Sequence, residues 1–187
     1  FQSITTETFL DFLKAELPEV FEKVDVHKWV YEPGLPERKN RPVSHLFDEI
    51  TKVLNEYEQG KRPIREQAAG WHRYQILSFL QGLPKKLPVE DCKYFEDTLA
   101  LEKANDGAFF SLFYAICVVS GYEEAMPRIE KFMGTVGRML YVFPIMRAMI
   151  ETDWSKGLAR PLFERVRDRH HPITIKATEG MLRKAGL

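Results

Sequence analysis

Apolar residues recur at helical spacing along almost the whole chain, and this pattern restricts the possible folds more than any other feature of the sequence. Residues three or four positions apart share one face of a helix, whereas a half-buried strand alternates apolar and polar positions. Such alternation is confined to the short stretch from Ile173 to Lys176. The pattern therefore predicts an all-α fold. With 187 residues, of which 44% are hydrophobic, the chain can bury a core of packed helices.

The segment from Asp106 to Ser120 is apolar on nearly every face of the helix that it predicts. A helix at the surface of a domain keeps one polar side, so a helix without a polar side needs neighbours all round. We therefore expect this segment to be the central helix of a helical stack.

Three prolines in the last third of the chain, Pro127, Pro144 and Pro161, are spaced by 17 residues. A proline inside a helix removes one backbone hydrogen bond and bends the helix. If the spacing reflects a repeat, similarly bent helices pack side by side, as in solenoids with units of roughly 34 residues or more. The alternative is a coincidence of spacing. The repeat predicts a two-layered stack of antiparallel helices, a right-handed solenoid of the HEAT or armadillo kind.

The polar segment from Glu32 to Pro42 has no helical period and contains three prolines. Such a segment is typical of a linker between domains. We place a linker at residues 32–42 and a helical domain at residues 43–187. Because an amphipathic pattern begins almost at Phe1, we expect residues 1–31 to follow upstream sequence that is missing here, whether the chain is a domain expressed alone or a proteolytic remnant.

Some residues predict helix ends. Ser44 can cap a helix whose core face is formed by Phe47, Ile50, Leu54 and Tyr57, and Gly60 would end it in the left-handed conformation. Ser120 and Glu123 have the spacing of a capping box at another helix start.

Charge and cysteine content argue against several classes of function. The 27 Lys and Arg residues balance the 27 Asp and Glu residues, so no overall field would hold nucleic acid or an anionic membrane surface. The longest apolar run, Ala108 to Val119, is shorter than the roughly 20 residues that span a bilayer. Cys92 and Cys117 lack the spacing of a disulfide framework or a thiolate metal site, which fits a reducing compartment and predicts a cytoplasmic protein.

The sequence contains no recognisable catalytic or metal-binding motif. H-E-x-x-H, G-x-G-x-x-G, Walker A and G-x-S-x-G are all absent. The adjacent His170 and His171 could form a metal or proton-shuttle site, but we expect them to be solvated or to cap the C-terminus of the charged helix before them. That helix alternates arginines with acids and predicts a self-paired, solvated face: Arg160, Glu164, Arg165, Arg167, Asp168 and Arg169. The three tryptophans are expected to be core or interface anchors.

Arg138 is the candidate ligand-binding residue. It follows Gly137 at the start of a helical pattern, where a cation meets the positive end of the helix dipole and costs roughly a few tenths of a kcal/mol unless it binds an anion. A guanidinium at a helix start suits a carboxylate, because its planar fork contacts both oxygens at once. The spacing alone leaves two interpretations, a substrate-binding residue or a partner in an internal salt bridge.

Several motifs resemble, in order and spacing, the C-terminal part of leukotriene A-4 hydrolase and its microbial aminopeptidase relatives. They cover almost the whole chain: Phe9-x-x-Phe12-Leu13, Trp29-Val30-Tyr31-Glu32-Pro33-Gly34-Leu35-Pro36, Tyr122-Glu123-Glu124-Ala125-Met126-Pro127, Gly137-Arg138-Met139-x-Tyr141-x-x-Pro144 and His171-Pro172-Ile173-Thr174.

The resemblance implies a multidomain zinc aminopeptidase with a β-rich domain, a catalytic domain carrying H-E-x-x-H, and a C-terminal domain of two helical layers. Residues 1–31 would then be the tail of the catalytic domain. The family's G-R-M arginine binds the substrate's C-terminal carboxylate, and Arg138 occupies its position. The leukotriene enzyme of mammals has a lysine two residues later, where this chain has Leu140, which puts a second anion contact and leukotriene hydrolysis in doubt.

Two functions follow from these observations. The first is the C-terminal domain of a zinc aminopeptidase, which shapes the substrate cleft, binds small peptides and is inactive without its upstream catalytic domain. The second is a free-standing helical-repeat scaffold that binds a protein partner along a concave face.

Overall fold

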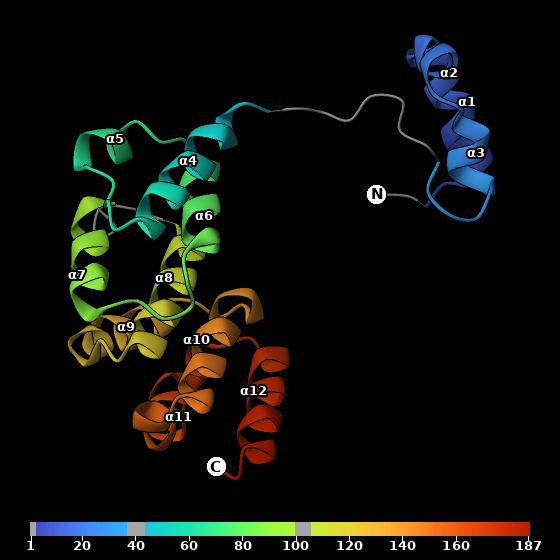
Figure 1. The fold of residues 1–187 in the computed structure, drawn as a ribbon. Helices are drawn as coiled ribbons and strands as arrows, with labels where there is room; N and C mark the ends of the chain where they lie inside the picture. The colour runs from blue at the N-terminus through green and yellow to red at the C-terminus, as the bar shows by residue number, and fades with distance from the viewer. Residues whose placement is uncertain (1–2, 37–43, 100–105) are drawn as a thin grey trace. The chain divides into compact units, whose positions relative to one another are not determined.

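The computed structural model describes residues 3–36, 44–99 and 106–187. The chain divides into two compact units, residues 1–43 and 44–187, and each is described by itself (Figure 1). The predicted linker, residues 32–42, follows the last helix of the first unit, and its residues 37–42 lie outside the described residues. The assignment of residues 1–31 to a preceding domain stays a prediction.

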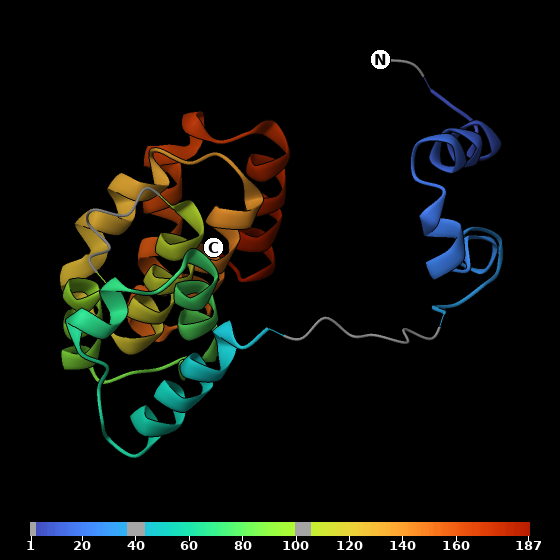
Figure 2. The same ribbon diagram turned by 90° about the horizontal axis from the view of Figure 1, so that it is seen from above.

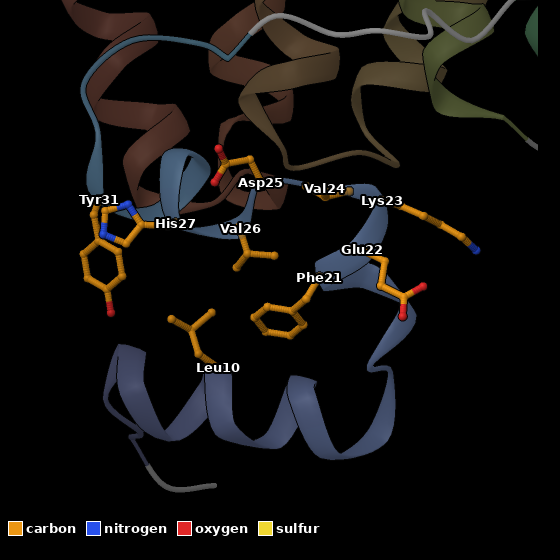
Figure 3. Close-up of a pocket in the computed structure, with 9 residues that line it drawn as sticks. All are labelled: Leu10, Phe21, Glu22, Lys23, Val24, Asp25, Val26, His27 and Tyr31. Carbon is orange, nitrogen blue, oxygen red and sulfur yellow. The ribbon is translucent and has the colours of Figure 1, made fainter.

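The first unit contains three short helices and almost no core. They are α1 (Thr6–Glu16), α2 (Glu19–Lys23) and α3 (Val26–Tyr31). Val26 is the one buried residue in its described part. Figure 3 shows an open hollow between α1 and the α2–α3 segment, into which Leu10, Phe21 and Val26 point. The unit leaves many of its apolar side chains uncovered, including Phe9, Phe12, Leu17 and Trp29.

The second unit is a two-layered stack of helices, as predicted. Its inner layer consists of α4 (Leu46–Glu58), α6 (Arg73–Gly82), α8 (Gly107–Ser120), α10 (Met139–Glu151) and α12 (Pro172–Lys184), each packed on the next. Its outer layer consists of α5 (Arg65–Ala69), α7 (Val89–Thr98), α9 (Met126–Met133) and α11 (Asp153–Val166), with short 3-10 turns at Glu123–Ala125 and Arg167–Arg169. The described residues contain no strand, and Figure 2 shows the stack from above.

The inner helices run parallel, so their first turns line one edge of the second unit, which we name the N-terminal edge. Contacts between successive first turns establish this direction: Gln75 Nε2 to Leu46 O (3.0 Å), Arg73 Nε to Asp106 Oδ2 (2.5 Å), Ser111 Oγ to Tyr141 O (2.9 Å) and Thr174 Oγ1 to Gly137 O (2.8 Å). The N-caps of the last four inner helices are residues 72, 106, 138 and 171, so the unit of the stack is about 33 residues long.

The predicted central helix is α8. It begins after the N-cap Asp106, whose carboxylate accepts the amide of Ala108, and ends at Gly121 with φ +78°. It packs on α6, α7 and α10, and Phe113 and Cys117 are fully buried within it. The absence of a polar face in the sequence therefore identified the centre of the stack.

The predictions for α4 are partly correct. His45, not Ser44, is the N-cap of α4, and the Nδ1 atom of its ring contacts Asp48 at 2.9 Å. The left-handed stop at Gly60 is confirmed, with φ +86°. Of the predicted core face of α4, Ile50 is buried, whereas Phe47 is exposed at the N-terminal edge.

The Ser120–Glu123 capping box does not form. Ser120 is the last residue of α8, and its hydroxyl accepts the amide of Leu87 at 2.9 Å. The hydroxyl is therefore committed to a segment 33 residues earlier, which the local spacing did not indicate.

The proline interpretation is also only partly correct. Pro144 and Pro161 lie inside α10 and α11, but Pro127 lies in the first turn of α9, where proline is tolerated. The stack does repeat, but its period is set by pairs of helices and not by three equivalent bends.

Candidate functional site

Arg138 lies at the N-cap of α10, as the sequence predicted. Its backbone is extended (φ −87°, ψ 138°), and its side chain is exposed at the N-terminal edge. No carboxylate within residues 3–36, 44–99 and 106–187 forms an ion pair with it. In the described part of the chain, the guanidinium is therefore available to an external anion.

The backbone before Arg138 is clamped by the start of α12. The carbonyl oxygen of Gly137 accepts the amide of His171 at 3.1 Å and the hydroxyl of Thr174 at 2.8 Å. The approach is so close that a Cβ atom on Gly137 would lie 2.9 Å from the carbonyl oxygen of Arg169. The clamp joins two motifs of the resemblance, G-R-M and H-P-I-T, and fixes the direction in which Arg138 leaves the stack.

The His170–His171 pair supports this clamp, which corrects the prediction for it. His171 is the N-cap of α12, not a C-terminal cap, and its Nδ1 accepts the amide of Ile173 at 3.2 Å. His170 is buried, with Nε2 3.0 Å from the carbonyl oxygen of Met133. Burial lowers the pKa of His170, although its hydrogen bond to Met133 opposes the shift. A neutral His170 therefore donates from Nε2 and holds the chain between α9 and α10 in place.

Tyr141 supports the side chain of Arg138 from the next turn. The guanidinium carbon of Arg138 lies 5.7 Å from the centre of the Tyr141 ring, within the range of a cation–π contact. Sequence analysis missed this residue, because the spacing of Arg138 and Tyr141 is compatible with contact but does not show that the guanidinium lies over the ring.

Arg73, another arginine on this edge, already has an anionic partner. Its Nε and Nη2 atoms contact the two carboxylate oxygens of Asp106 at 2.5 and 3.3 Å. The hydrogen bond that Arg73 donates to Asp106 is the main reason that the pKa of Arg73 is raised. Leu140, 63% exposed, offers no charge, so Arg138 provides the cation of the G-R-M segment that could bind a carboxylate.

The charged run from Arg160 to Arg169 is only partly self-paired, which corrects the prediction. Arg160 contacts Glu164, Arg165 contacts Glu130, and Arg167 contacts Glu179. Glu130 lies on α9 and Glu179 on α12, so these ion pairs join α11 and the 3-10 turn after it to other helices.

Two tryptophans anchor the second unit, whereas the third is exposed. Trp71 donates to Glu49, and Trp154 donates to the carbonyl oxygen of Val118. Trp29, in the first unit, is 43% exposed.

Neither cysteine is in a disulfide, and both are buried. Burial raises the pKa of Cys117, whereas a hydrogen bond from Cys117 lowers that of Cys92. Within the described residues, no three side chains of His, Cys, Asp or Glu gather closely enough to hold a metal ion. The helices in the same residues are too short or too polar to cross a bilayer.

Comparison with known proteins identifies the family. A family model described as "Leukotriene A4 hydrolase, C-terminal" matches residues 71–182, which run from the start of α6 into the last turn of α12 and include Arg138. The chain belongs to this family.

Similar curated proteins of this family include "Leucine aminopeptidase 2" of Ajellomyces capsulatus, 27% identical over 80% of the chain and 25% of the relative. The protein of the same name from Pyricularia oryzae is 29% identical over 89% of the chain and 28% of the relative. The chain therefore spans about a quarter of the length of these relatives.

Two solved structures have a similar fold. Native leukotriene A4 hydrolase from Saccharomyces cerevisiae has a TM-score of 0.68 and 21% identity, and the alignment covers 100% of this chain and 33% of that one. Another structure of the native yeast enzyme has a TM-score of 0.73 and 22% identity, covering 97% of this chain and 33% of that one.

Proposed function

We propose that this chain is the C-terminal helical domain of a zinc-dependent aminopeptidase, and that Arg138 binds the C-terminal carboxylate of short peptide substrates. The observation that carries the proposal is Arg138 itself, an exposed guanidinium on a clamped backbone with no ion pair among the described residues. The relatives that are named aminopeptidases are about four times as long as their match to this chain, which leaves room for an upstream catalytic domain.

The N-terminal edge has the character of a surface that another part of the polypeptide covers. Of the eight large hydrophobic side chains exposed in the described part of residues 44–187, six lie in the first two positions of inner helices: Leu46, Phe47, Tyr74, Met139, Leu140 and Ile173. Exposed apolar groups concentrated on one edge indicate an interaction surface. A catalytic domain seated there would enclose a cleft with Arg138 in its wall.

The first unit also supports the presence of an upstream domain. Its described part buries only Val26, so three short helices of this kind cannot be expected to hold together without further contacts. We assign residues 1–31 to the end of the catalytic domain, whose remaining sequence would cover Phe9, Phe12 and Trp29.

The described residues do not fit a zinc site, since no cluster of ligands is present in them. In the proposed enzyme the metal chemistry therefore belongs to the upstream domain, where zinc would polarise the scissile carbonyl. The residues of this chain bind and orient the substrate. We place the enzyme in the cytoplasm, because the two cysteines of this chain are free and buried.

Substitution of Arg138 in the full-length polypeptide tests the proposal. For peptides with a free C-terminal carboxylate, Arg138→Ala should lower kcat/KM. The loss should correspond to about 2 to 4 kcal/mol of transition-state stabilisation, the range for losing one partner of a desolvated charge pair. Peptides with an amidated C-terminus should lose much less. Arg138→Lys should recover only part of the activity, because an ammonium cannot bind both oxygens through a planar fork.

Arg147, exposed on the same helix α10, provides the matched control. Arg147→Ala removes an arginine without touching the clamp and should leave both substrate types unchanged. Equal losses for free and amidated peptides in Arg138→Ala would show that Arg138 has a structural role, and the carboxylate assignment would be wrong.

The alternative is a free-standing helical-repeat scaffold, which the exposed apolar edge would also suit. The upstream coding sequence separates the two functions. A reading frame with H-E-x-x-H ahead of Phe1 supports the aminopeptidase, and a frame without it supports the scaffold.

A further inference from the structure

Within the described residues, the guanidinium of Arg138 forms no hydrogen bond or ion pair, and it lies over the ring of Tyr141. A cation over the face of a ring is attracted by the negative charge of its π-system. This contact uses none of the five N–H donors of the guanidinium, so all of them stay available to a carboxylate. A salt bridge in the same place would hold the side chain but would also occupy these donors.

The ring of Tyr141 is itself fixed by α8. The backbone carbonyl of Tyr141 accepts the hydroxyl of Ser111, a buried residue, at 2.9 Å. The ring packs against Gly107: a Cβ atom on that glycine would lie 3.1 Å from Cε2 and 3.3 Å from Cδ2 and Cζ of the tyrosine. The ring can therefore lie where it does because position 107 carries no side chain.

The start of α8 is fixed in turn. Asp106 caps the helix by accepting the amide of Ala108 at 2.9 Å, and it is bound by Arg73 from α6. A continuous series of contacts thus runs from α6 through Asp106 and Gly107 to Tyr141, and ends at the guanidinium of Arg138.

We propose that Tyr141 is a positioning residue, whose ring holds the Arg138 guanidinium ready for the substrate carboxylate, and that Gly107 provides the space for that ring. This inference rests on the proposed function. A long side chain that is already held loses less conformational freedom when the ligand binds, so the contact strengthens binding without touching the substrate.

The experiment compares variants of the full-length polypeptide on matched tripeptides with free and amidated C-termini. Tyr141→Leu should raise KM for the free carboxylate by about two- to fivefold, as expected for loss of an exposed cation–π contact, with kcat unchanged. KM for the amidated peptide should not change. Tyr141→Phe keeps the ring and should match the wild type, whereas Gly107→Ala crowds the ring and should raise KM for the free carboxylate by less than Tyr141→Leu does.

Two further variants separate the ring's charge distribution from its shape. Replacing Tyr141 with pentafluorophenylalanine keeps the ring's shape but removes its attraction for a cation, so KM for the free carboxylate should rise as in Tyr141→Leu even if the leucine variant folds poorly. In the Arg138→Ala background, Tyr141→Leu should cause no further loss.

The outcomes distinguish this inference from the function on which it rests. If Arg138→Ala affects free and amidated peptides equally, the carboxylate assignment itself fails. If Arg138→Ala is selective but the fluorinated ring behaves as the wild type, or Tyr141→Leu acts fully in the absence of Arg138, Tyr141 does not position Arg138 and the inference is overturned while the proposed function stands.

Discussion

Replacing Gly137 with alanine would place a methyl group against backbone atoms of the α11–α12 connection. The new Cβ would lie 2.9 Å from the oxygen of Arg169, 3.3 Å from the amide nitrogen of His171 and 3.5 Å from Cα of His170. Gly137 does not have a positive φ, so the backbone conformation itself tolerates alanine, and the cost is steric. Overpacking of this kind costs about 1 to 3 kcal/mol.

Relief of the clash would weaken the clamp. If the loop moves away, the hydrogen bonds from His171 and Thr174 to the Gly137 carbonyl lengthen, and each contributes about 0.5 to 1.5 kcal/mol. Alanine also restricts the unfolded chain, which offsets about 0.4 to 1 kcal/mol of this destabilisation. The structure thus predicts that Gly137→Ala lowers the free energy of unfolding by about 2 kcal/mol.

Urea unfolding followed by far-UV circular dichroism measures this change. Gly180, in α12, is the matched control, because a Cβ atom there meets nothing within 4 Å. Gly180→Ala should raise the free energy of unfolding by about 0.5 to 1 kcal/mol, since alanine is favoured over glycine inside a helix. The reasoning is refuted if both variants shift stability in the same direction, or if Gly137→Ala unfolds like the wild type.

Three other predictions address the pH response, the inter-helix contact at Ser120 and the activity of the isolated chain. Because the pKa of His170 is lowered in the folded state, the unfolded state takes up its proton first as the pH falls, so the free energy of unfolding declines below about pH 6.5. In His170→Gln, whose amide can still donate to Met133, thermal unfolding should depend less on pH between about pH 7.5 and 5.5. Identical pH responses of the variant and the wild type would contradict this. Ser120→Ala removes the acceptor of the Leu87 amide and should cost about 1 to 3 kcal/mol in urea unfolding, whereas a change below about 0.5 kcal/mol would argue against that bond. The 187-residue chain alone should bind no stoichiometric zinc and hydrolyse no aminoacyl p-nitroanilide, and metal analysis together with turnover by the purified chain would detect the opposite.

The sequence predicted the layers of the fold because burial follows the helical period closely. The apolar surface all round α8 marked the centre of the stack, and the cation at the start of α10 marked Arg138. Both signals are local, since a single helix and its first turn contain all the residues needed to recognise them.

The contacts that organise the site are not local, and the sequence did not reveal them. Ser120 looked like a helix cap because Glu123 lies three positions later, but its hydroxyl binds a backbone amide 33 residues earlier. His170 looked solvated because it follows a charged helix, but it is buried against Met133, and the amide of the exposed His171 binds Gly137. Helix-to-helix contacts of this kind depend on the register between layers, which a pattern within one helix does not encode.

The direction of the inner helices bears on the proposed binding role of Arg138 at this edge. Parallel helices place all their positive ends together, where acids are favoured and cations are disfavoured. Among the inner helices, Asp106 is the acidic N-cap and is bound by Arg73, whereas Arg138 stands at its N-cap without an acidic partner in the described residues. An enclosing domain that covers the apolar first turns would exclude water and strengthen the attraction between Arg138 and a carboxylate. A scaffold for a protein partner accounts for the apolar turns alone, whereas a substrate cleft accounts for both the apolar turns and the unpaired arginine.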